Sequence, residues 1–380
     1  MNFEFTEEQL MIRQAARDFA QRELLPDVLE RDENARFPAD HVKKLAELGF
    51  LGMMIPPEYD GGGMDTVSYV LAMEEIAKVD ASVAVIMSVN NSLVCYGLNR
   101  FCNEEQKQKY LKPLARGEIL GAFLLSEPEA GSDATHQYTS AEDKGDYYLL
   151  NGTKNWITNG GSASTYIVMA QTHPEKRSHG INAFIVPKDT PGITVGPHEN
   201  KMGMRSSDTH SVMFQDVKVP KENRIGEDGF GFKFAMMVLE AGRIGIASQA
   251  LGIASGAFER AVAYAKERKA FGTEIINHQS LAFKLSDMAV KIENARNLCL
   301  KAAWLKDQHK PITVASAMAK QYAADIAMEV TTEAVQIHGG YGYVKEYHVE
   351  RLMREAKLTQ IYEGTSEIQK IIISRSLMKG

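Results

Sequence analysis

The chain has 380 residues, of which 44% are apolar and 24% charged, with a net charge of −6 and a pI near 6.0. This composition predicts a globular protein with two or three subdomains and no basic face of the kind that nucleic-acid binding needs. Three cysteines without a C-x-x-C pair support neither a disulfide framework nor a zinc site, and no apolar run is long enough to span a membrane.

The first eight residues are acidic and contain no basic stretch followed by an apolar core. They resemble neither a secretory signal nor a mitochondrial transit peptide. We therefore expect a cytoplasmic protein, although a processed organellar protein would have the same kind of start.

Residues 1–117 are predicted to form an α-helical domain. Thr6-Glu7-Glu8-Gln9 has the pattern of a capping box, and apolar residues follow it at helical spacing. Further helices are predicted at 38–48, 67–79, 82–101 and 103–115, with a loop around the prolines and glycines of 56–63.

Residues 118–231 have the pattern of a β domain. Alternating and β-branched runs occur at 147–150, 165–170, 181–186, 193–195, 211–214 and 217–219, between turn signals such as Asn151-Gly152, Gly160-Gly161 and Pro191-Gly192. We expect a mostly antiparallel barrel or sandwich.

Residues 232–380 are predicted to form a helical bundle. Leu281, Leu285, Met288, Ile292, Ala295 and Cys299 follow one another at intervals of three and four residues, as in a bundle seam. Residues 243–268 and 313–336 form comparably long helical patterns. The chain is thus predicted to be an α+β multidomain protein, in the order α, β, α.

A carboxylate near the C-terminus is the first candidate for chemistry. Glu363 stands directly before Gly364, whose lack of a Cβ lets the backbone approach a bound group. Thr365 and Ser366 suit the cap of a helix over 367–378. Glu363 is either a base whose pKa is raised by burial or an acidic residue favoured by the helix dipole.

Two segments of the β region carry ligand-binding residue types. Residues 125–133, Leu-Ser-Glu-Pro-Glu-Ala-Gly-Ser-Asp, follow an apolar strand, and their small residues, hydroxyls and N–H groups suit a planar heterocycle or a pyrophosphate. A solvent-exposed turn would use the same residues. Thirty residues on, Trp156 stands beside Ile157 and Thr158, where it can pack against a ring system or belong to the core.

The C-terminal region adds cations and glycines. Arg268 and Lys269 close a long helix, which suits either capping or a pyrophosphate. Gln336-Ile337-His338 precedes the glycine-rich turn at Gly339-Gly340, and we expect a structural role for His338. Arg243 is predicted to lie early in its helix, where the dipole disfavours a cation and an anionic partner is therefore indicated.

Other site classes are not supported by the sequence. There is no G-x-G-x-x-G motif opening a βαβ unit, no Walker A sequence and no G-x-S-x-G elbow. No His, Cys and carboxylate cluster has metal-ligand spacing, so no metal is expected.

Taken together, these segments resemble the acyl-CoA dehydrogenase family over essentially the whole chain. Lys201-Met202-Gly203-Met204-Arg205-Ser206-Ser207 and Gly242-Arg243-Ile244-Gly245-Ile246-Ala247 add two more stretches to the resemblance. The segment Ile361-Tyr362-Glu363-Gly364-Thr365-Ser366-Glu367-Ile368-Gln369 is similar to the short-chain, butyryl-CoA-type members.

The resemblance implies an N-terminal helical domain, a middle β domain and a C-terminal four-helix bundle, assembled as a homotetramer with FAD between the β domain and the bundle. By position, the residues implied near the isoalloxazine ring are Phe123, Leu125, Ser126, Gly131, Ser132, Trp156, Ile157 and Thr158. Those implied at the adenine and pyrophosphate end, across a subunit interface, are Arg268, Phe271, Gln279, Gln336, Gly339 and Gly340. Thr365 and Glu367 would complete the cofactor site, and Ser132, Glu240, Arg243 and Gly364 would meet the acyl-CoA.

The implied reaction makes a trans-2-enoyl-CoA from a short-chain acyl-CoA. Glu363 would take the α-proton while the β-hydrogen leaves as hydride to flavin N5, and electrons would pass to an electron-transfer flavoprotein. The Glu363 N–H and a ribityl hydroxyl would stabilise the developing enolate. The isovaleryl-type branch carries its base on the earlier helix, where this chain has Gly242.

Three alternatives stay open from the sequence. A dehydrogenase of branched short acyl-CoAs would differ only in pocket shape, and an acyl-CoA oxidase would pass electrons to O2. A flavin-binding helical scaffold would lack the chemistry altogether. The segment 135–138, Thr-His-Gln-Tyr, is bulkier than the resemblance implies and puts the nearby CoA contacts in question.

Overall fold

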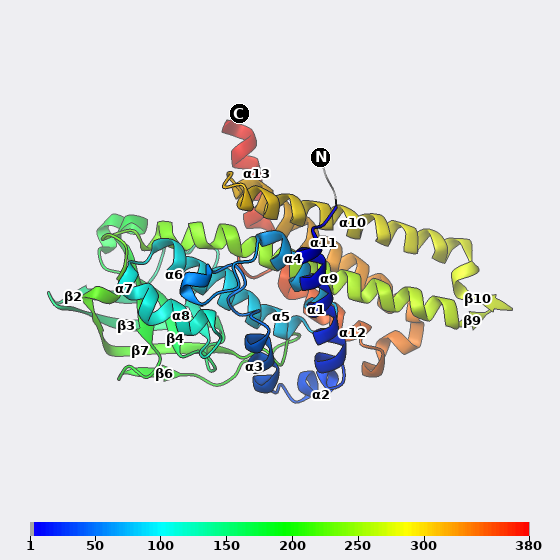
Figure 1. Ribbon diagram of the computed structural model, residues 1–380, viewed down its shortest axis with the longest axis horizontal. Coiled ribbons are helices and arrows are strands. Elements are labelled where there is room, and N and C mark those ends of the chain that lie inside the picture. Colours follow the sequence, from blue (N-terminus) through cyan, green and yellow to red (C-terminus); the bar gives the residue numbers. More distant parts are fainter. Residues whose placement is uncertain (1–3, 380) are drawn as a thin grey trace.

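Helices, a sheet and a helical bundle follow one another along the chain, as the sequence predicts. The computed structural model describes residues 4–379. In Figure 1 the sheet lies at one end of the molecule and the small turn β9–β10 at the other, with α9 running between them.

The N-terminal region is helical. Its helices are α1 Glu7–Phe19, α2 Val28–Glu33, α3 Ala39–Glu47, α4 Thr66–Ala77, α5 Ala81–Ser88, α6 Tyr96–Phe101, α7 Glu104–Gln106 and α8 Lys112–Ala115. The predicted capping box is confirmed, because Thr6 and Gln9 each accept a hydrogen bond from the other's backbone N–H.

One N-terminal helix is apolar enough to be compared with a membrane span. A π-helical turn, Val89–Cys95, joins α5 to α6 in one continuous helix over Ala81–Phe101. Its length and composition would suit a span, but 94% of its most apolar window is buried inside the molecule. Burial against protein on all sides is what a core helix shows.

The middle region forms one eight-stranded sheet in the order β6-β7-β3-β2-β4-β5-β8, with β1 paired to β4. The strands are β1 Gly121–Leu124, β2 Ser140–Asp143, β3 Tyr147–Thr158, β4 Thr165–Gln171, β5 Ile181–Pro187, β6 Ile193–Val195, β7 Thr209–Pro220 and β8 Arg224–Ile225. The sheet is mostly antiparallel, and β4 has parallel neighbours in β1 and β2.

The predicted turn at Asn151-Gly152 is wrong. β3 runs through it, and Gly152 has φ +142° at a shift in register against β7. A Cβ there would stand 2.6 Å from Thr139 Cα, so the glycine permits close strand packing at a bulge. The runs 211–214 and 217–219 likewise belong to the single strand β7. The sequence missed β2 because only Ala141 of its four residues is buried.

The C-terminal region is a bundle of long helices. They are α9 Gly231–Glu267, α10 Gln279–Asp307, α11 Thr313–His338, α12 Val349–Thr359 and α13 Ser366–Lys379, and the two-stranded turn is β9 Lys269–Ala270 with β10 Thr273–Glu274. Helix α9 is central, because it packs against α4, α10, α11 and α12 and also against β4 and β5. One helix therefore joins all three regions around a shared core.

Candidate active site

A large cavity of about 1050 Å³ lies where the three regions meet. Its walls come from the turn 89–95, the loop after β1, the end of β3, one face of α9, the end of α12 and the start of α13. The predicted site residues that border it are Phe123, Leu125, Ser126, Gly131, Ser132, Trp156, Ile157, Thr158, Arg243, Glu363, Gly364 and Thr365. Residues far apart in the sequence are thus brought to one place.

Helix α9 forms one wall of this cavity. Phe232, Met236, Leu239 and Arg243 border it at intervals of four, three and four residues, which is one stripe of a helix. The prediction that Arg243 lies early in its helix is wrong, because α9 begins at Gly231. The dipole argument therefore does not apply. Arg243 is nonetheless buried, and its Nε and one terminal nitrogen have no hydrogen-bond partner among residues 4–379.

Glu363 lies in the loop between α12 and α13. Its φ is +51° and that of Gly364 is +91°, so the backbone is left-handed at both residues. The loop is closed by Ser366 N–H donating to Gln360 O at 2.9 Å. The predicted cap is confirmed for Thr365, whose hydroxyl accepts from Ile368 N–H at 3.3 Å, but Ser366 is already helical and its hydroxyl donates to Asp325.

The Glu363 carboxylate rests against the backbone of α9. A Cβ added to Gly242 would stand 2.4 Å from Glu363 Oε2, and that oxygen is buried with no hydrogen-bond partner in the described part of the chain. A side chain at 242 would therefore occupy the place of the carboxylate. Because residue 242 is a glycine, the Glu363 carboxylate can lie against this wall of the cavity.

Burial controls the charge of Glu363. Removal from water raises the pKa of its carboxyl to about 7, although Lys320 and Arg243 act in the opposite direction. Burial also lowers the pKa of Lys320 to about 8 and the pKa of Arg243 from its usual value. A carboxyl with a pKa near neutrality can both accept and release a proton at physiological pH.

A buried ion pair shapes the loop after β1. Lys154 Nζ on β3 donates to Glu127 Oε1 at 2.8 Å and to Leu125 O at 3.1 Å. Glu127 also accepts from the N–H groups of Tyr138 and Thr139, at 2.6 and 3.0 Å. The pair thereby fixes both ends of the loop that carries Ser126 and Ser132.

Trp156 does not belong to the core. Its backbone is left-handed, with φ +61°, and 62% of its surface is exposed at the edge of the cavity. Ile157 is buried behind it, and Thr158 pairs with Thr209 of β7. The indole is therefore available to a bound ring system.

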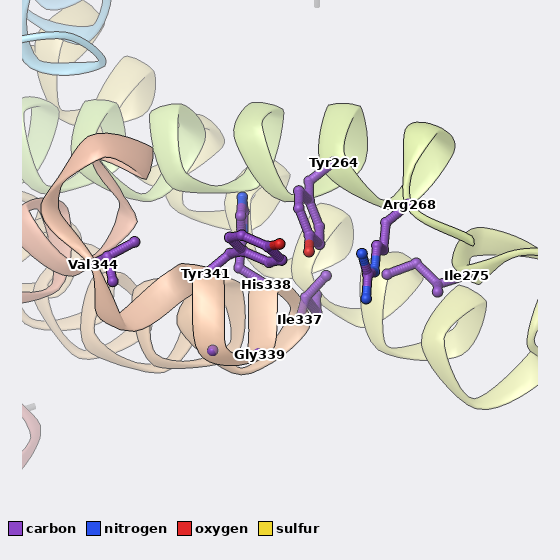
Figure 2. Close-up of a pocket in the computed structure, with 9 residues that line it drawn as sticks. Tyr264, Arg268, Ile275, Ile337, His338, Gly339, Tyr341 and Val344 are labelled. Atoms are coloured by element: carbon purple, nitrogen blue, oxygen red, sulfur yellow. The ribbon is translucent and has the colours of Figure 1, made fainter. Parts of the chain in front are cut away.

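A second hollow of about 490 Å³ lies near the far end of α9 (Figure 2). Arg268, Gly339 and Gly340 border it, as do Tyr264 and Tyr341. The structural role expected for His338 is supported, because its Nδ1 lies 2.8 Å from Ala334 O and its ring stacks on Tyr264 at 4.3 Å. Figure 2 shows Tyr264 of α9 and Arg268, directly after the end of that helix, projecting toward the segment that carries His338 and Tyr341.

The remaining predicted site residues border neither hollow. They are Glu240, Phe271, Gln279, Gln336 and Glu367. Glu240 accepts a hydrogen bond from the Thr313 hydroxyl at 2.7 Å, and 98% of the Phe271 surface is exposed. Their roles stay predictions.

Several residues of the cavity were missed from the sequence. They are Val89, Leu93, Lys201, Phe232, Met236, Leu239, Arg354, Lys357, Tyr362, Ile368 and Arg375, among others. Spacing on one helix face could have found the α9 stripe. The others come from other helices and from loops, such as those of Lys201 and Tyr362, whose orientation toward the cavity the periodicity does not reveal.

Three family models together match almost the whole chain. They are the N-terminal domain, the middle domain and the C-terminal domain of acyl-CoA dehydrogenase, at residues 6–118, 122–217 and 229–378. The chain belongs to the acyl-CoA dehydrogenase family. It is therefore an FAD-dependent oxidoreductase, as the sequence predicts.

Individual relatives share the full length. The short-chain specific acyl-CoA dehydrogenase of Clostridium acetobutylicum is 50% identical over 379 residues, covering all of both chains. The structure of butyryl-CoA dehydrogenase from Megasphaera elsdenii superposes with a TM-score of 0.98 at 50% identity, again covering both chains completely. A chain from a structural study of the electron transferring flavoprotein of Acidaminococcus fermentans superposes with a TM-score of 0.99 at 51% identity and full coverage of both chains.

No metal centre accompanies the cavity in the described residues. Between residues 4 and 379, no group of three or more His, Cys, Asp or Glu side chains is arranged to hold a metal ion.

Proposed function

We propose that this acyl-CoA dehydrogenase acts on short-chain substrates such as butyryl-CoA and produces trans-2-enoyl-CoA, with Glu363 as the base. The observation that carries this proposal is the Glu363 carboxylate, whose Oε2 is buried without a partner at the wall of the large cavity. Burial raises its pKa to about 7. A base poised near the working pH is what abstraction of a weakly acidic proton requires.

The large cavity fits the flavin of FAD. Its volume of about 1050 Å³ is at the upper end for small-molecule sites. Phe123, Leu125 and Ile157 give apolar walls, Ser126 and Thr158 offer hydroxyl donors, and Trp156 presents an exposed ring. We assign these residues, with Gly131, Ser132 and Thr365 beside them, to the flavin. Bound FAD supplies the hydride acceptor.

Glu363 Oε2 would take the proton from the carbon α to the thioester. The α9 backbone at Gly242 supports the carboxylate, and the apolar side chains of Val89, Leu93 and Leu239 keep water away. The N–H of Glu363 donates to no acceptor within the described residues, so it is free for the thioester oxygen as negative charge develops there.

The acyl-CoA would meet residues around this base. We assign Ser132, Arg243 and Gly364 to the substrate, because all three border the same cavity as Glu363. Glu240 would contribute indirectly, since its carboxylate is hydrogen-bonded to Thr313 and does not border the cavity.

The second hollow suits the other end of FAD from a partner subunit. Arg268 lies 25 residues beyond Arg243, about 37 Å along an α-helix. We propose that Arg268, Gly339 and Gly340 bind the adenine and pyrophosphate of an FAD whose ring lies in a second subunit of a homotetramer. Phe271, Gln279 and Gln336 would border that shared site. Glu367, in the first turn of α13 beside Thr365, would complete the cofactor site.

Substrate length and electron acceptor are proposed from the relatives. Those described above are named for short-chain acyl-CoA and butyryl-CoA, and one superposed chain comes from a study of an electron transferring flavoprotein. We propose an electron-transfer flavoprotein as the acceptor. The domain boundaries 1–117, 118–231 and 232–380 and the cytoplasmic location stay predictions.

Anaerobic titration of the purified yellow protein with butyryl-CoA tests the proposal, with Glu363→Gln as the paired variant. We expect the flavin band of the wild type to bleach, and the variant to keep FAD and bind acyl-CoA without bleaching. Normal turnover by the variant would remove Glu363 from its role.

Other outcomes of the same titration identify the alternatives. Bleaching only with branched or longer acyl-CoA would move the substrate, and hydrogen peroxide formed during aerobic turnover would indicate an oxidase. A holoprotein that shows no spectral response to any acyl-CoA would favour the scaffold.

A further inference from the structure

Helix α11 holds the loop of Glu363 from beneath. Lys320 is 0% exposed, and its Nζ donates a hydrogen bond to the Gly364 carbonyl at 2.6 Å. Gln369 Nε2 of α13 donates to the same oxygen at 2.8 Å. The Gly364–Thr365 peptide, one residue beyond the proposed base, is therefore held by two donors from two helices.

The ends of this loop are fixed to α11 as well. Asp325 Oδ1 accepts from Gln360 Nε2 at 2.8 Å and from the Ser366 hydroxyl at 3.1 Å. Lys320 and Asp325 lie five residues apart on α11. One helix thus holds the start, the middle and the end of the segment 360–366.

The backbone at Glu363 needs such support. A residue other than glycine at φ +51° adopts a sparsely populated conformation, which persists only where the surroundings determine it. The turn aims the carboxylate at Gly242 and the cavity. Releasing the Gly364 carbonyl would free the peptide to rotate and move the carboxylate.

Fold stability alone does not account for a lysine here. Burying an ammonium costs free energy unless a carboxylate compensates it. Within residues 4–379, Lys320 makes no ion pair within 4.0 Å, and its one hydrogen bond goes to the Gly364 carbonyl. An apolar side chain at this position would stabilise the core more than the lysine does. The buried charge next to the loop of the proposed base therefore indicates a function.

We propose that Lys320 is a positioning residue for the base. It holds the Gly364 carbonyl so that the Glu363 carboxylate faces the cavity, and its positive charge favours the ionised form of that carboxylate. This inference rests on the proposed role of Glu363.

The charged groups around the pair define the expected pH behaviour. Lys320 faces Glu363, Asp325, Arg243 and Glu367, and burial lowers its pKa to about 8. Glu363 faces Lys320 and Arg243, and its charge also acts on the hydroxyls of Tyr69 and Tyr362. Catalysis should need an ionised Glu363, above about pH 7, together with a charged Lys320, below about pH 8.

Four holoenzyme variants test the proposal: Lys320→Met, Lys320→Gln, Lys320→Arg and the control Lys306→Met. Lys306 has its pKa lowered to about 8 by burial, but it contacts Met54, Thr66 and Tyr96 away from the cavity. FAD content, thermal melting and kcat for butyryl-CoA against pH are measured for each.

Lys320→Met should keep FAD and lower kcat by roughly 100-fold, the effect of misplacing a catalytic group by about 1 Å. Its KM should change little, and its acid limb should move to higher pH because the cation that lowers the pKa of Glu363 is lost. Lys320→Arg should recover most of the activity and lose the basic limb near pH 8, since arginine stays charged. Lys306→Met should resemble the wild type.

An unchanged kcat and acid limb in Lys320→Met would overturn the proposal. Should that variant lose FAD or fail to fold, Lys320→Gln decides, because glutamine keeps a donor without the charge: an acid limb at higher pH supports the proposal, and an unmoved limb overturns it. Glu363→Gln separates the two levels. If it is inactive while the Lys320 variants are normal, only the positioning role fails, and if it is active, the proposed base itself fails.

Discussion

Gly242→Ala measures how strictly the cavity fixes the position of the proposed base, Glu363. The new Cβ would stand 2.4 Å from Glu363 Oε2, whereas an ordinary contact needs at least 3.4 Å. The carboxylate must therefore retreat by about 1 Å. Because it is the end of a flexible side chain, it can do so without disturbing the fold.

The expected magnitude follows from this displacement. A shift of about 1 Å in a catalytic group costs about 100-fold in rate, or about 2.7 kcal/mol of transition-state stabilisation. The free energy of unfolding should change by less than this. Alanine has about 1 kcal/mol more helix propensity than glycine, which offsets part of the roughly 1–3 kcal/mol that crowding Leu93 would cost, because its Cδ2 would be 2.7 Å away. The variant should fold, retain FAD and be slow.

The assay is anaerobic single-turnover reduction by butyryl-CoA, followed at the flavin band, with thermal melting in parallel. Gly97→Ala is the matched control, because the three atoms nearest to a Cβ there are side-chain carbons of Phe234 and Val238, at 3.0–3.3 Å. A Gly242→Ala enzyme that reduces its flavin as fast as the control would refute the reasoning. It would show that Glu363 works from more than one position.

Two further predictions concern charge. The pKa of Glu363 is raised to about 7, so the proposed base is ionised above that pH. We expect kcat to fall about tenfold for each pH unit below about 7, whereas an acid limb of the kcat–pH profile near pH 4.5 would indicate an unperturbed carboxyl. Lys154→Met leaves Glu127 buried without its cation. This should lower the free energy of unfolding, measured in urea, by about 3–5 kcal/mol and weaken FAD retention. A decrease below about 1 kcal/mol with normal FAD content would contradict the role of this pair in fixing the loop.

The order of the three regions could be read from the sequence because it depends on local periodicity. Helical spacing and alternation identify most elements without knowledge of their partners. The exceptions are instructive: Gly152 carries a turn signal but forms a bulge, since the packing of Thr139 against it decides the local structure.

The site was only partly predictable, for a related reason. Glu363, Trp156 and the loop 125–133 belong to recognisable segments, whereas Lys320 contacts a carbonyl 44 residues away and Lys154 a carboxylate 27 residues away. Nothing local in the sequence marks these lysines as buried. Their roles arise only when two elements meet.

Helix α9 also limits how this protein can vary in evolution. From Gly231 to Glu267 it carries the cavity stripe, the glycine beneath the base and, just beyond its end, Arg268 of the second hollow. One inserted or deleted residue would turn everything after it by about 100° and shift it by about 1.5 Å. A substitution on α9 away from the cavity acts at one position, whereas a change in the length of α9 alters both sites at once.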